Sequence, residues 1–266
     1  MSNHLENEVL YEIDQHVATI TFNRAEKQNT ISGPMLNRLS ELMLKADEDP
    51  EIRAIVITRS WKFFCAGLDL LGSHISNNLA TNKKSPVTLD LKNTPPTVLH
   101  NLDTPTIAAI NGSAAGYGMD LALGCDIRVM ADSAKLAAAF TARGVVPESG
   151  GTWILPRLIG WAKASEIIFT GKTLLAEECL ELGLVSHMVN NNEVGEKSLE
   201  IARQISSRAP LAVQASKRMM RMGMNENFND HVHHVFLQLL PLFQSDDFAE
   251  GMASFMEKRE AEFKGK

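Results

Sequence analysis

Apolar residues recur in two patterns along the chain, and the change from one to the other comes near Asn190. Before that point, short apolar runs typical of strands alternate with turns and with short segments of helical spacing. After it, only helical spacing continues. This order predicts an α/β fold in which a core, residues 1–200, is followed by a helical C-terminal region, residues 201–266.

The spacing also places the individual elements. Strands are predicted at 9–13, 17–22, 54–58, 107–110, 127–130 and 184–189, with a further extended piece at 135–140. Helices are predicted at 34–47, after the two prolines 95–96, and at 119–123, 152–159, 162–169, 173–183, 194–207, 210–222, 226–243 and 246–263. The segment 72–92 is polar and has little periodicity, so it is interpreted as a long loop or lid.

Composition narrows the class of protein. The 266 residues can bury a sizeable core, and 44% hydrophobic with 22% charged residues is ordinary for a globular protein. The net charge of −6 supplies no basic field for nucleic acid, so an anionic substrate would have to be met by local positive charges. Cys65, Cys125 and Cys179 are widely spaced, which predicts neither a disulfide framework nor a zinc site.

The first residues, MSNHLENEVLYEID, are polar and acidic, unlike a secretory signal or an Arg-rich transit peptide. No apolar run approaches the roughly 20 residues needed to span a bilayer. We therefore expect a cytoplasmic protein with no membrane partner.

One stretch, residues 106–152, concentrates the candidate chemistry. An apolar strand leads into the small-residue turn NGSAAGYG at 111–118, and a short apolar helix follows. Glycine lets the backbone approach a ligand closely, and a helix start presents free N–H groups with partial positive charge. Such a turn can hold an oxygen that carries negative charge, and Asp120 and Glu148 flank it. The stretch predicts an oxyanion site with acid/base chemistry beside it.

Several segments in order carry a resemblance to a known family: NRAEKQNTIS, FFCAGLDL, AAINGSAAGYGMDLALGCDIRV, VPESGGTWILPRLIG, TGKTLLAEECLELGLVS and DDFAEGMASFMEKREAEFKGK. They resemble the crotonase superfamily, the enoyl-CoA hydratase/isomerase family. The resemblance implies a spiral of repeated ββα turns, with C-terminal helices that build a trimer or a dimer of trimers. It also implies an acyl-CoA thioester substrate, no metal and no further cofactor, because coenzyme A is part of the substrate.

The resemblance assigns the oxyanion site to two backbone N–H groups, those of Leu68 and Tyr117. Ala66, Gly67 and Gly116 adjoin them and would contact the substrate. Backbone donors tolerate a change of side chain, and losing one such donor typically costs about 2.7–4 kcal/mol of transition-state stabilisation. Without the resemblance, the turn would be interpreted as an ordinary start of a helix.

The acid/base pair departs from the pattern of the hydratases. They use two glutamates, and the first corresponds to Asp120 here, while the second aligns with Phe140 or Thr141, where this chain has no carboxylate. Glu148 matches a position where several isomerases of the family carry a catalytic carboxylate. Because one base can take a proton from one carbon and return it to another, we predict Glu148 as the base and Asp120 as a second acid/base or polarising group. The alternatives are structural: Glu148 caps the next helix, and Asp120 interacts with a helix dipole.

The coenzyme would need local contacts. Arg24 and Lys27 match the family's region for its adenine and phosphates, while Phe255 and Lys258 match positions that reach the coenzyme on a neighbouring subunit. Lysine would act there as a point charge, and the alternative for each charged residue is a solvated surface position.

Other reactive residues are interpreted as structural. His231, His233 and His234 lie on a predicted helix where no carboxylate or cysteine partner is evident, which indicates surface histidines. Cys65 has no paired histidine and is interpreted as packing, and the methionines of 219–224 as packing or interface.

The sequence therefore predicts enoyl-CoA isomerisation. Hydration of a 2-enoyl-CoA by Asp120 and Glu148 together is the alternative, and thioester hydrolysis or another enolate reaction stays open because the fold hosts several chemistries. A protein that binds acyl-CoA without efficient turnover is the alternative of another class. The position of Asp120 and Glu148 distinguishes an enzyme from a binding protein, since a catalytic pair should face one apolar pocket. The acyl group, the pathway and the choice of trimer or hexamer are left open.

Overall fold

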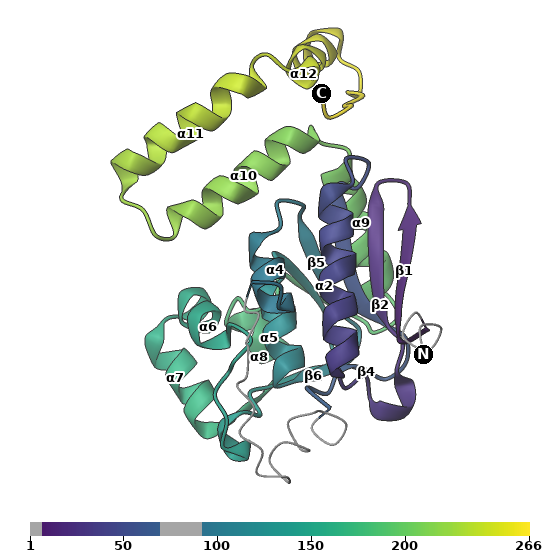
Figure 1. Ribbon diagram of the computed structural model, residues 1–266, viewed down its shortest axis with the longest axis vertical. Helices are drawn as coiled ribbons and strands as arrows, with labels where there is room; N and C mark the ends of the chain where they lie inside the picture. Colours follow the sequence, from purple (N-terminus) through teal and green to yellow (C-terminus); the bar gives the residue numbers. More distant parts are fainter. Residues whose placement is uncertain (1–6, 70–91) are drawn as a thin grey trace.

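The computed structural model describes residues 7–69 and 92–266 (Figure 1). The loop predicted at 72–92 lies outside the described residues except for Lys92. None of the helices in the described part combines the length and the apolar character needed to cross a membrane.

Within these residues the strands form two sheets. The larger has six strands in the order β1-β2-β3-β5-β7-β10, and the smaller has four in the order β4-β6-β8-β9. The larger sheet contains β1 (Val9–Asp14), β2 (Val17–Phe22), β3 (Ala54–Arg59), β5 (Thr106–Ile110), β7 (Ile127–Ala131) and β10 (His187–Val189). The smaller contains β4 (Phe63–Cys65), β6 (Ser113–Ala115), β8 (Lys135–Ala137) and β9 (Thr173–Leu175). The β1–β2 and β8–β9 pairs are antiparallel and the other pairs are parallel.

The order of pairing reveals the spiral. Each pass of the chain places one strand in the larger sheet and the next in the smaller, so that β3-β5-β7 and β4-β6-β8 pair in the same sequence. Helices complete the passes, and α5 (Tyr117–Gly124) separates β6 from β7. The fold is therefore a spiral of ββα turns with a parallel sheet, as the resemblance implied.

Helices cover the sheets where their apolar faces require it. They are α2 (Gly33–Glu48), α4 (Pro95–Asn101), α6 (Gly151–Ile159), α7 (Trp161–Thr170), α8 (Ala176–Glu181), α9 (Val194–Ser206), α10 (Pro210–Gly223), α11 (Phe228–Leu242) and α12 (Asp246–Glu257), with 3-10 turns η1 (Ala25–Lys27) and η2 (Thr141–Arg143). In α2, Ser32 accepts a hydrogen bond from the Met35 N–H, Pro34 stands in the first turn, and one apolar face is buried.

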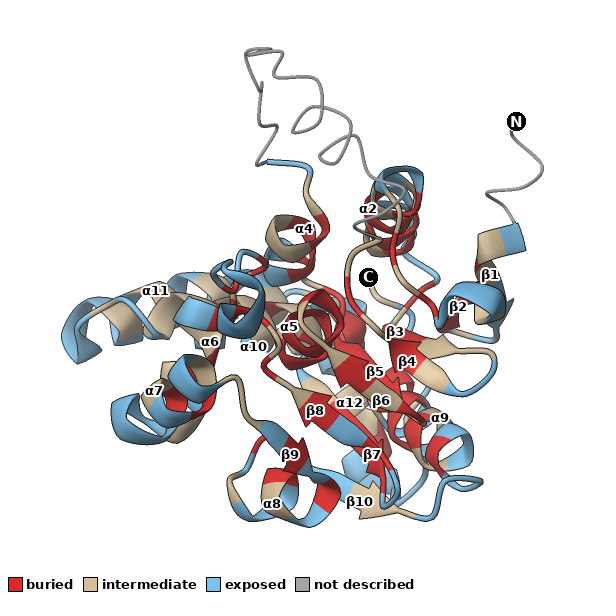
Figure 2. Ribbon diagram, turned by 90° about the horizontal axis from the view of Figure 1, so that it is seen from below, coloured by how far each residue is buried: buried red, intermediate tan, exposed pale blue. Residues whose placement is uncertain are grey.

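The core lies around α5 and the central strands. Every residue of β5 is buried, and so are the first seven residues of α5, so this short helix is enclosed on all sides (Figure 2). A helix that is apolar on all sides is stable in a protein interior. Asp120 is the one carboxylate of α5 and is buried with the helix. That enclosure is what positions the site.

Helix α9 spans the predicted boundary between the core and the helical C-terminal region. The suggested boundary after residue 200 passes through α9, which packs against β2, β3, β5 and β7. Beyond it, α10 and α11 form an antiparallel pair and α12 follows, on the side of the molecule away from β4 and β6 (Figure 1).

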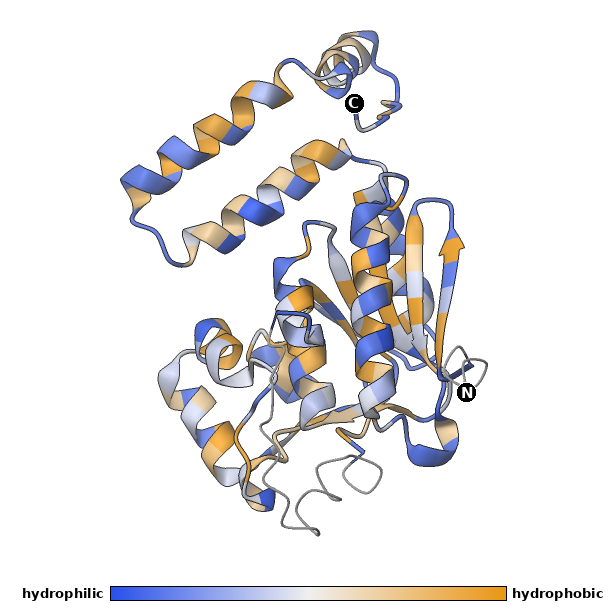
Figure 3. Cartoon of the chain, in the orientation of Figure 1, coloured by the Kyte–Doolittle hydropathy of each residue, from blue (hydrophilic) through white to orange (hydrophobic). Residues whose placement is uncertain are grey.

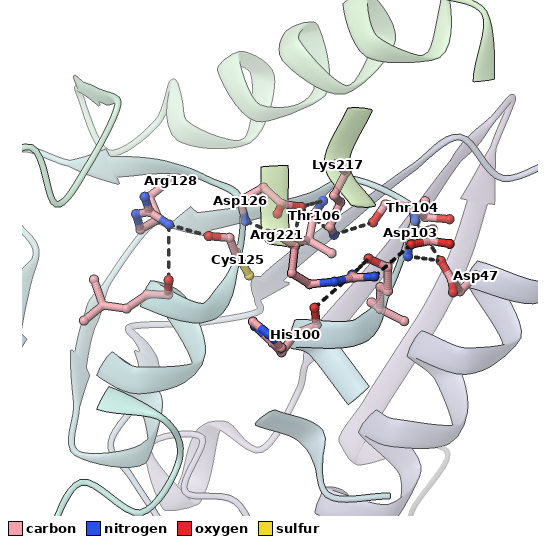
Figure 4. Close-up of polar contacts among 12 residues, drawn as sticks. Asp47, His100, Asp103, Thr104, Thr106, Cys125, Asp126, Arg128, Lys217 and Arg221 are labelled. Atoms are coloured by element: carbon pink, nitrogen blue, oxygen red, sulfur yellow. Dashed lines mark hydrogen bonds and ion pairs between the residues drawn. The ribbon is translucent and has the colours of Figure 1, made fainter. Parts of the chain in front are cut away.

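Polar contacts attach α10 to the core. Lys217 Nζ lies 2.7 Å from Asp126 Oδ2 and donates to the Thr104 carbonyl at 2.9 Å. Arg221 donates to the Leu102 carbonyl at 3.0 Å and to Asp103 Oδ1 at 3.1 Å (Figure 4). These contacts join α10 to the segment between α4 and β5 and to the start of β7.

Four expectations were wrong in detail. The turn predicted at 111–118 contains β6, whose Ser-Ala-Ala sequence shows no strand pattern, and the α5 helix starts at Tyr117 instead of residue 119. The helix predicted at 173–183 begins with β9 and becomes α8 only at Ala176. The last helix ends at Glu257, because Lys258 adopts a left-handed conformation with φ 56°.

Candidate active site

The two predicted oxyanion segments leave the same edge of the smaller sheet. Strands β4 and β6 pair in parallel, with Cys65 opposite Ala114. Parallel strands end on the same side, so the segment Ala66-Gly67-Leu68 and the segment Gly116-Tyr117 emerge next to each other. The structure thus brings together the residues that the resemblance assigned to this function.

Glycine is required where these segments touch. Gly116 has φ 52° and ψ −121°, and Gly67 has φ 108°, conformations that other residues rarely adopt. A Cβ on Gly67 would lie 3.3 Å from the Ala115 carbonyl oxygen, and one on Gly118 would lie 2.3 Å from the Cys65 carbonyl oxygen. The start of α5 therefore packs directly on the end of β4.

The N–H groups of Leu68 and Tyr117 have no partner in the described part of the chain. Their neighbours are occupied: Asp69 N–H donates to Ile31 at 2.9 Å, and Gly116 N–H donates to Ala137 at 2.9 Å. Tyr117 is the first residue of α5, where N–H groups have no acceptor within the helix. Both predicted oxyanion donors are thus available for a ligand.

Asp120 lies one turn along α5 and is 2% exposed. Its Oδ2 accepts hydrogen bonds from Ser149 Oγ at 3.0 Å and from Gly151 N–H at 3.1 Å. Burial raises the pKa of this carboxyl to about 7 against the opposing effect of these donors, and the nearby charge of Glu148 raises it further. Near neutral pH the group exists in both protonation states.

Glu148 reaches the same neighbourhood from a loop. The side chain is exposed, while Pro147 and Ser149 on either side are buried and anchor the loop before α6. Its charge raises the pKa of both Asp120 and Tyr117. The two carboxylates therefore lie close enough to interact electrostatically, but only Asp120 is enclosed by its own chain.

Aromatic rings make the remaining wall apolar. Phe140 is buried, and its Cε1 atom would lie 3.9 Å from a Cβ on Gly116. The ring thus occupies the region that the resemblance assigns to the second glutamate of hydratases. Tyr117 is also buried, and burial raises the pKa of its phenol well above 10, so the phenol stays neutral. Burial likewise raises the pKa of Cys65 to about 12, which agrees with packing instead of reactivity.

Arg24 and Lys27 differ in burial and in their partners. Arg24 Nη1 lies 2.8 Å from Asp69 Oδ2, and its Nε lies 3.2 Å from Glu8 Oε1, in partly buried surroundings. These two carboxylates balance its charge and hold the loop after β2. Lys27 is exposed at the end of η1, so its side chain is open to solvent.

Phe255 and Lys258 are not brought to this site by their own chain. Both are exposed, at the end of α12, which lies on the far side of the core from β4 and β6 (Figure 1). Their predicted contact with coenzyme would have to be made on another subunit.

Two functional contacts escaped the sequence analysis. Ser149 and Gly151 hold Asp120 across 29 and 31 residues of chain, and a Cβ on Gly151 would lie 2.2 Å from Asp120 Oδ1. The signal available was the small-residue run SGG directly after Glu148.

The histidine interpretation also needs correction. Glu226 is a carboxylate partner of both His231 and His234, with Nδ1–carboxylate distances of 3.2 and 3.1 Å. Within residues 7–69 and 92–266, no group of three or more His, Cys, Asp or Glu side chains is placed to hold a metal ion.

Comparison with known proteins places this chain in a family. A family model described as enoyl-CoA hydratase/isomerase matches residues 12–266. The methylglutaconyl-CoA hydratase of Rattus norvegicus mitochondria is 34% identical over 271 residues, covering 98% of this chain and 82% of the relative. The short-chain-enoyl-CoA hydratase of Clostridium acetobutylicum is 32% identical over 257 residues, covering 96% and 97%.

Solved structures agree. The crystal structure of an enoyl-CoA hydratase from Bacillus anthracis superposes with a TM-score of 0.89 at 32% identity. The superposition covers 97% of this chain and 100% of the other. The spiral core and the C-terminal helices are therefore shared over almost the entire length.

Proposed function

The chain belongs to the enoyl-CoA hydratase/isomerase family, and from that premise we propose that it isomerises a 3-enoyl-CoA to the 2-enoyl-CoA. The acyl-CoA thioester as substrate class follows the family. The choice of isomerisation is supported by one feature: the resemblance aligns the second glutamate of hydratases with Phe140 or Thr141, and the chain has a buried ring and no carboxylate there.

The N–H groups of Leu68 and Tyr117 would receive the thioester oxygen. Both are free of other partners within the described residues, and Tyr117 adds the positive end of the α5 dipole. They would acidify the C2 proton by stabilising the enolate that its removal creates, and donors fixed in this way need no reorganisation during the reaction.

Glu148 would act as the base. It takes the C2 proton, and the electrons of the broken C–H bond delocalise through C1 onto the thioester oxygen and through C3 onto C4. The same carboxyl then returns the proton to C4. The double bond then lies between C2 and C3, and the mass is unchanged. Asp120, when protonated, would act as a neutral polarising group beside the dienolate, without adding a second negative charge.

Hydration of a 2-enoyl-CoA is a second candidate, favoured by the names of the relatives. All three proteins compared above are named hydratases. In that reaction Asp120 and Glu148 would hold and activate a water together, which agrees with the electrostatic interaction between them.

An assembly of three copies, alone or as a pair of trimers, is part of the proposal. No residue of α11 is buried, and Phe228, Phe236 and Leu240 are more than half exposed. Figure 3 shows hydrophobic positions along α11, and the described residues of the chain bury none of them. Such a surface marks an interface, and sedimentation of the purified protein would measure the number of copies. A cytoplasmic location stays a prediction.

The test compares the wild type with Glu148→Gln on a 3-enoyl-CoA and, separately, on a 2-enoyl-CoA, with products resolved by mass and retention time. Loss of the base should lower isomerisation by at least about a hundredfold, within the usual contribution of such a group. Water added to the 2-enoyl substrate, without isomerisation of the other, would replace isomerase by hydratase. Binding of both thioesters without any product would support the non-catalytic alternative and overturn the proposal.

A further inference from the structure

Ser149 has a side chain whose role the proposed reaction does not include. It is 2% exposed, it follows the proposed base directly, and its hydroxyl lies 3.0 Å from Asp120 Oδ2. We propose that Ser149 is a positioning residue: it holds Oδ2 of Asp120 as an acceptor and so leaves the acidic proton to Oδ1. This inference rests on the proposed function, because it concerns how Asp120 is prepared for that reaction.

Two of the hydrogen bonds that Asp120 accepts converge on one oxygen, and the backbone N–H of Ser149 is a further donor to this carboxyl. Ser149 Oγ and Gly151 N–H both donate to Oδ2, whereas no side chain in the described part donates to Oδ1. An oxygen that already accepts two donors is a poor site for a proton. The missing side chain at Gly151 keeps space at Oδ1, since a Cβ there would lie 2.2 Å from it.

The two neighbours in the loop act on Asp120 in opposite directions. The Glu148 charge favours the protonated form, whereas the Ser149 hydroxyl favours the charged form through its hydrogen bond. A single loop, residues 147–151, thereby supplies three groups that act on Asp120. They are the proposed base Glu148, the Ser149 hydroxyl that opposes the effect of Glu148, and the Gly151 N–H. Burial and the Glu148 charge both raise the pKa of Asp120, and the Ser149 hydroxyl lowers it. Without the hydroxyl, Asp120 would keep its proton to higher pH.

The elements packed against α5 supply few other titratable groups. Cys65 stands on β4 and stays a thiol, His100 stands on α4, and Arg157 stands on α6 over the Trp153 ring. The charges that act on His100 are those of Arg221, Lys217 and Asp126. On α5 itself, Tyr117 is neutral. Glu148 and Ser149 therefore remain the side chains that set the state of Asp120.

The experiment titrates Asp120 directly, by carboxyl carbon NMR of Asp-labelled protein, with Asp120→Asn to assign the signal. Ser149→Ala should raise the pKa of Asp120 by roughly 0.5–1 pH unit, the equivalent of one hydrogen bond. Ser149→Thr, which keeps the hydroxyl, should restore the wild-type value. Ser198→Ala removes an equally buried hydroxyl in α9 and should change nothing. Glu148→Gln should lower the pKa.

The pH dependence of kcat/KM on a 3-enoyl-CoA is measured in parallel. The decline toward high pH should move upward in Ser149→Ala by the same amount as the titration. An unchanged titration in folded Ser149→Ala would overturn the role of Ser149. A shifted titration with an unshifted pH profile would support that role and would instead contradict the part that the proposed function gives to Asp120.

Discussion

The core buries its apolar side chains, whereas the helical region leaves many of its apolar side chains exposed. In the core, β5 and the first seven residues of α5 are buried completely by the same chain. In the helical region, α11 has no buried residue, and Phe255 on α12 is 81% exposed. The first region is buried within one chain, whereas the second presents an apolar surface that the described residues leave uncovered, as interfaces do.

This difference in burial divides the proposed function into two parts, the chemistry on the acyl group and the binding of coenzyme. The oxyanion donors, Asp120 and Glu148 come together around α5 within a single chain. The predicted coenzyme contacts at Phe255 and Lys258 belong to the incomplete region. The chemistry should therefore depend on packing inside the core, and binding of coenzyme should depend on assembly.

The largest expected effect comes from crowding Asp120. A Cβ in Gly151→Ala would lie 2.2 Å from Asp120 Oδ1, so either α6 or the carboxyl must move. Since a displacement of about 1 Å can cost a hundredfold in rate, kcat should fall by at least about that factor. The control is Gly195→Ala, in α9, where a Cβ meets nothing within 4 Å. Full activity of Gly151→Ala would show that α6 yields and that the packing is not essential.

The next effect concerns stability and pH. A pKa raised from 3.8 to about 7 means that the folded chain holds the Asp120 proton more tightly than the unfolded chain does. Between about pH 4 and pH 7 the folded state binds more protons, so the free energy of unfolding falls as pH rises. The loss of stability caused by ionising Asp120 is absent below about pH 4 and complete above about pH 7. The pKa shift corresponds to a loss of roughly 4 kcal/mol at most.

Asp120→Asn should remove this penalty. Urea unfolding should show the variant up to about 4 kcal/mol more stable than the wild type at pH 8, and equal to it at pH 4. The matched control is Asp132→Asn, whose side chain is exposed and should show no such trend. A variant that is less stable at pH 8 would contradict the view that the core tolerates a costly carboxylate for the reaction.

A smaller effect is expected where the two regions meet. Lys217→Met removes the ion pair with Asp126 and the bond to the Thr104 carbonyl, and leaves a carboxylate with fewer partners (Figure 4). Denaturant unfolding should show a loss of about 1–3 kcal/mol. The exposed pair Lys197–Glu200 provides the control, because Lys197→Met should cost less than about 1 kcal/mol. Equal costs would mean that the Lys217 contacts do not hold α10 to the core.

The sequence predicted the elements whose apolar pattern is strong. The strands at 17–22 and 127–130 and the helices that end at Gly160 and Gly171 are confirmed, because apolar runs and glycine stops are local signals. Strand β6 has no such pattern, and its place is fixed by pairing with β4 and β8. The spiral itself was implied by the resemblance and not by the spacing.

Within the site, the sequence supplied residues but not their partners. Asp120 and Glu148 stood out as carboxylates beside a glycine-rich turn, whereas the bond from Ser149 spans 29 residues and follows only from the folded core. Arg24 was predicted to face coenzyme, and its pairing with Glu8 and Asp69 depends on chain segments that lie far apart in sequence. The carboxylate partner of His231 and His234 is Glu226, which falls within the helix predicted at 226–243 but precedes α11 in the structure, so helical spacing did not reveal the contact.

The most direct test of the central claim, that Glu148 removes a proton from the carbon next to the thioester, uses a saturated acyl-CoA in heavy water. Proton NMR would follow exchange of the C2 hydrogens, which requires the enolate but neither isomerisation nor hydration. The wild type should exchange them, Glu148→Gln should do so at least about a hundredfold more slowly, and Asp120→Asn should retain exchange. Exchange at the wild-type rate in Glu148→Gln, with loss in Asp120→Asn, would assign the base to Asp120 and contradict this account.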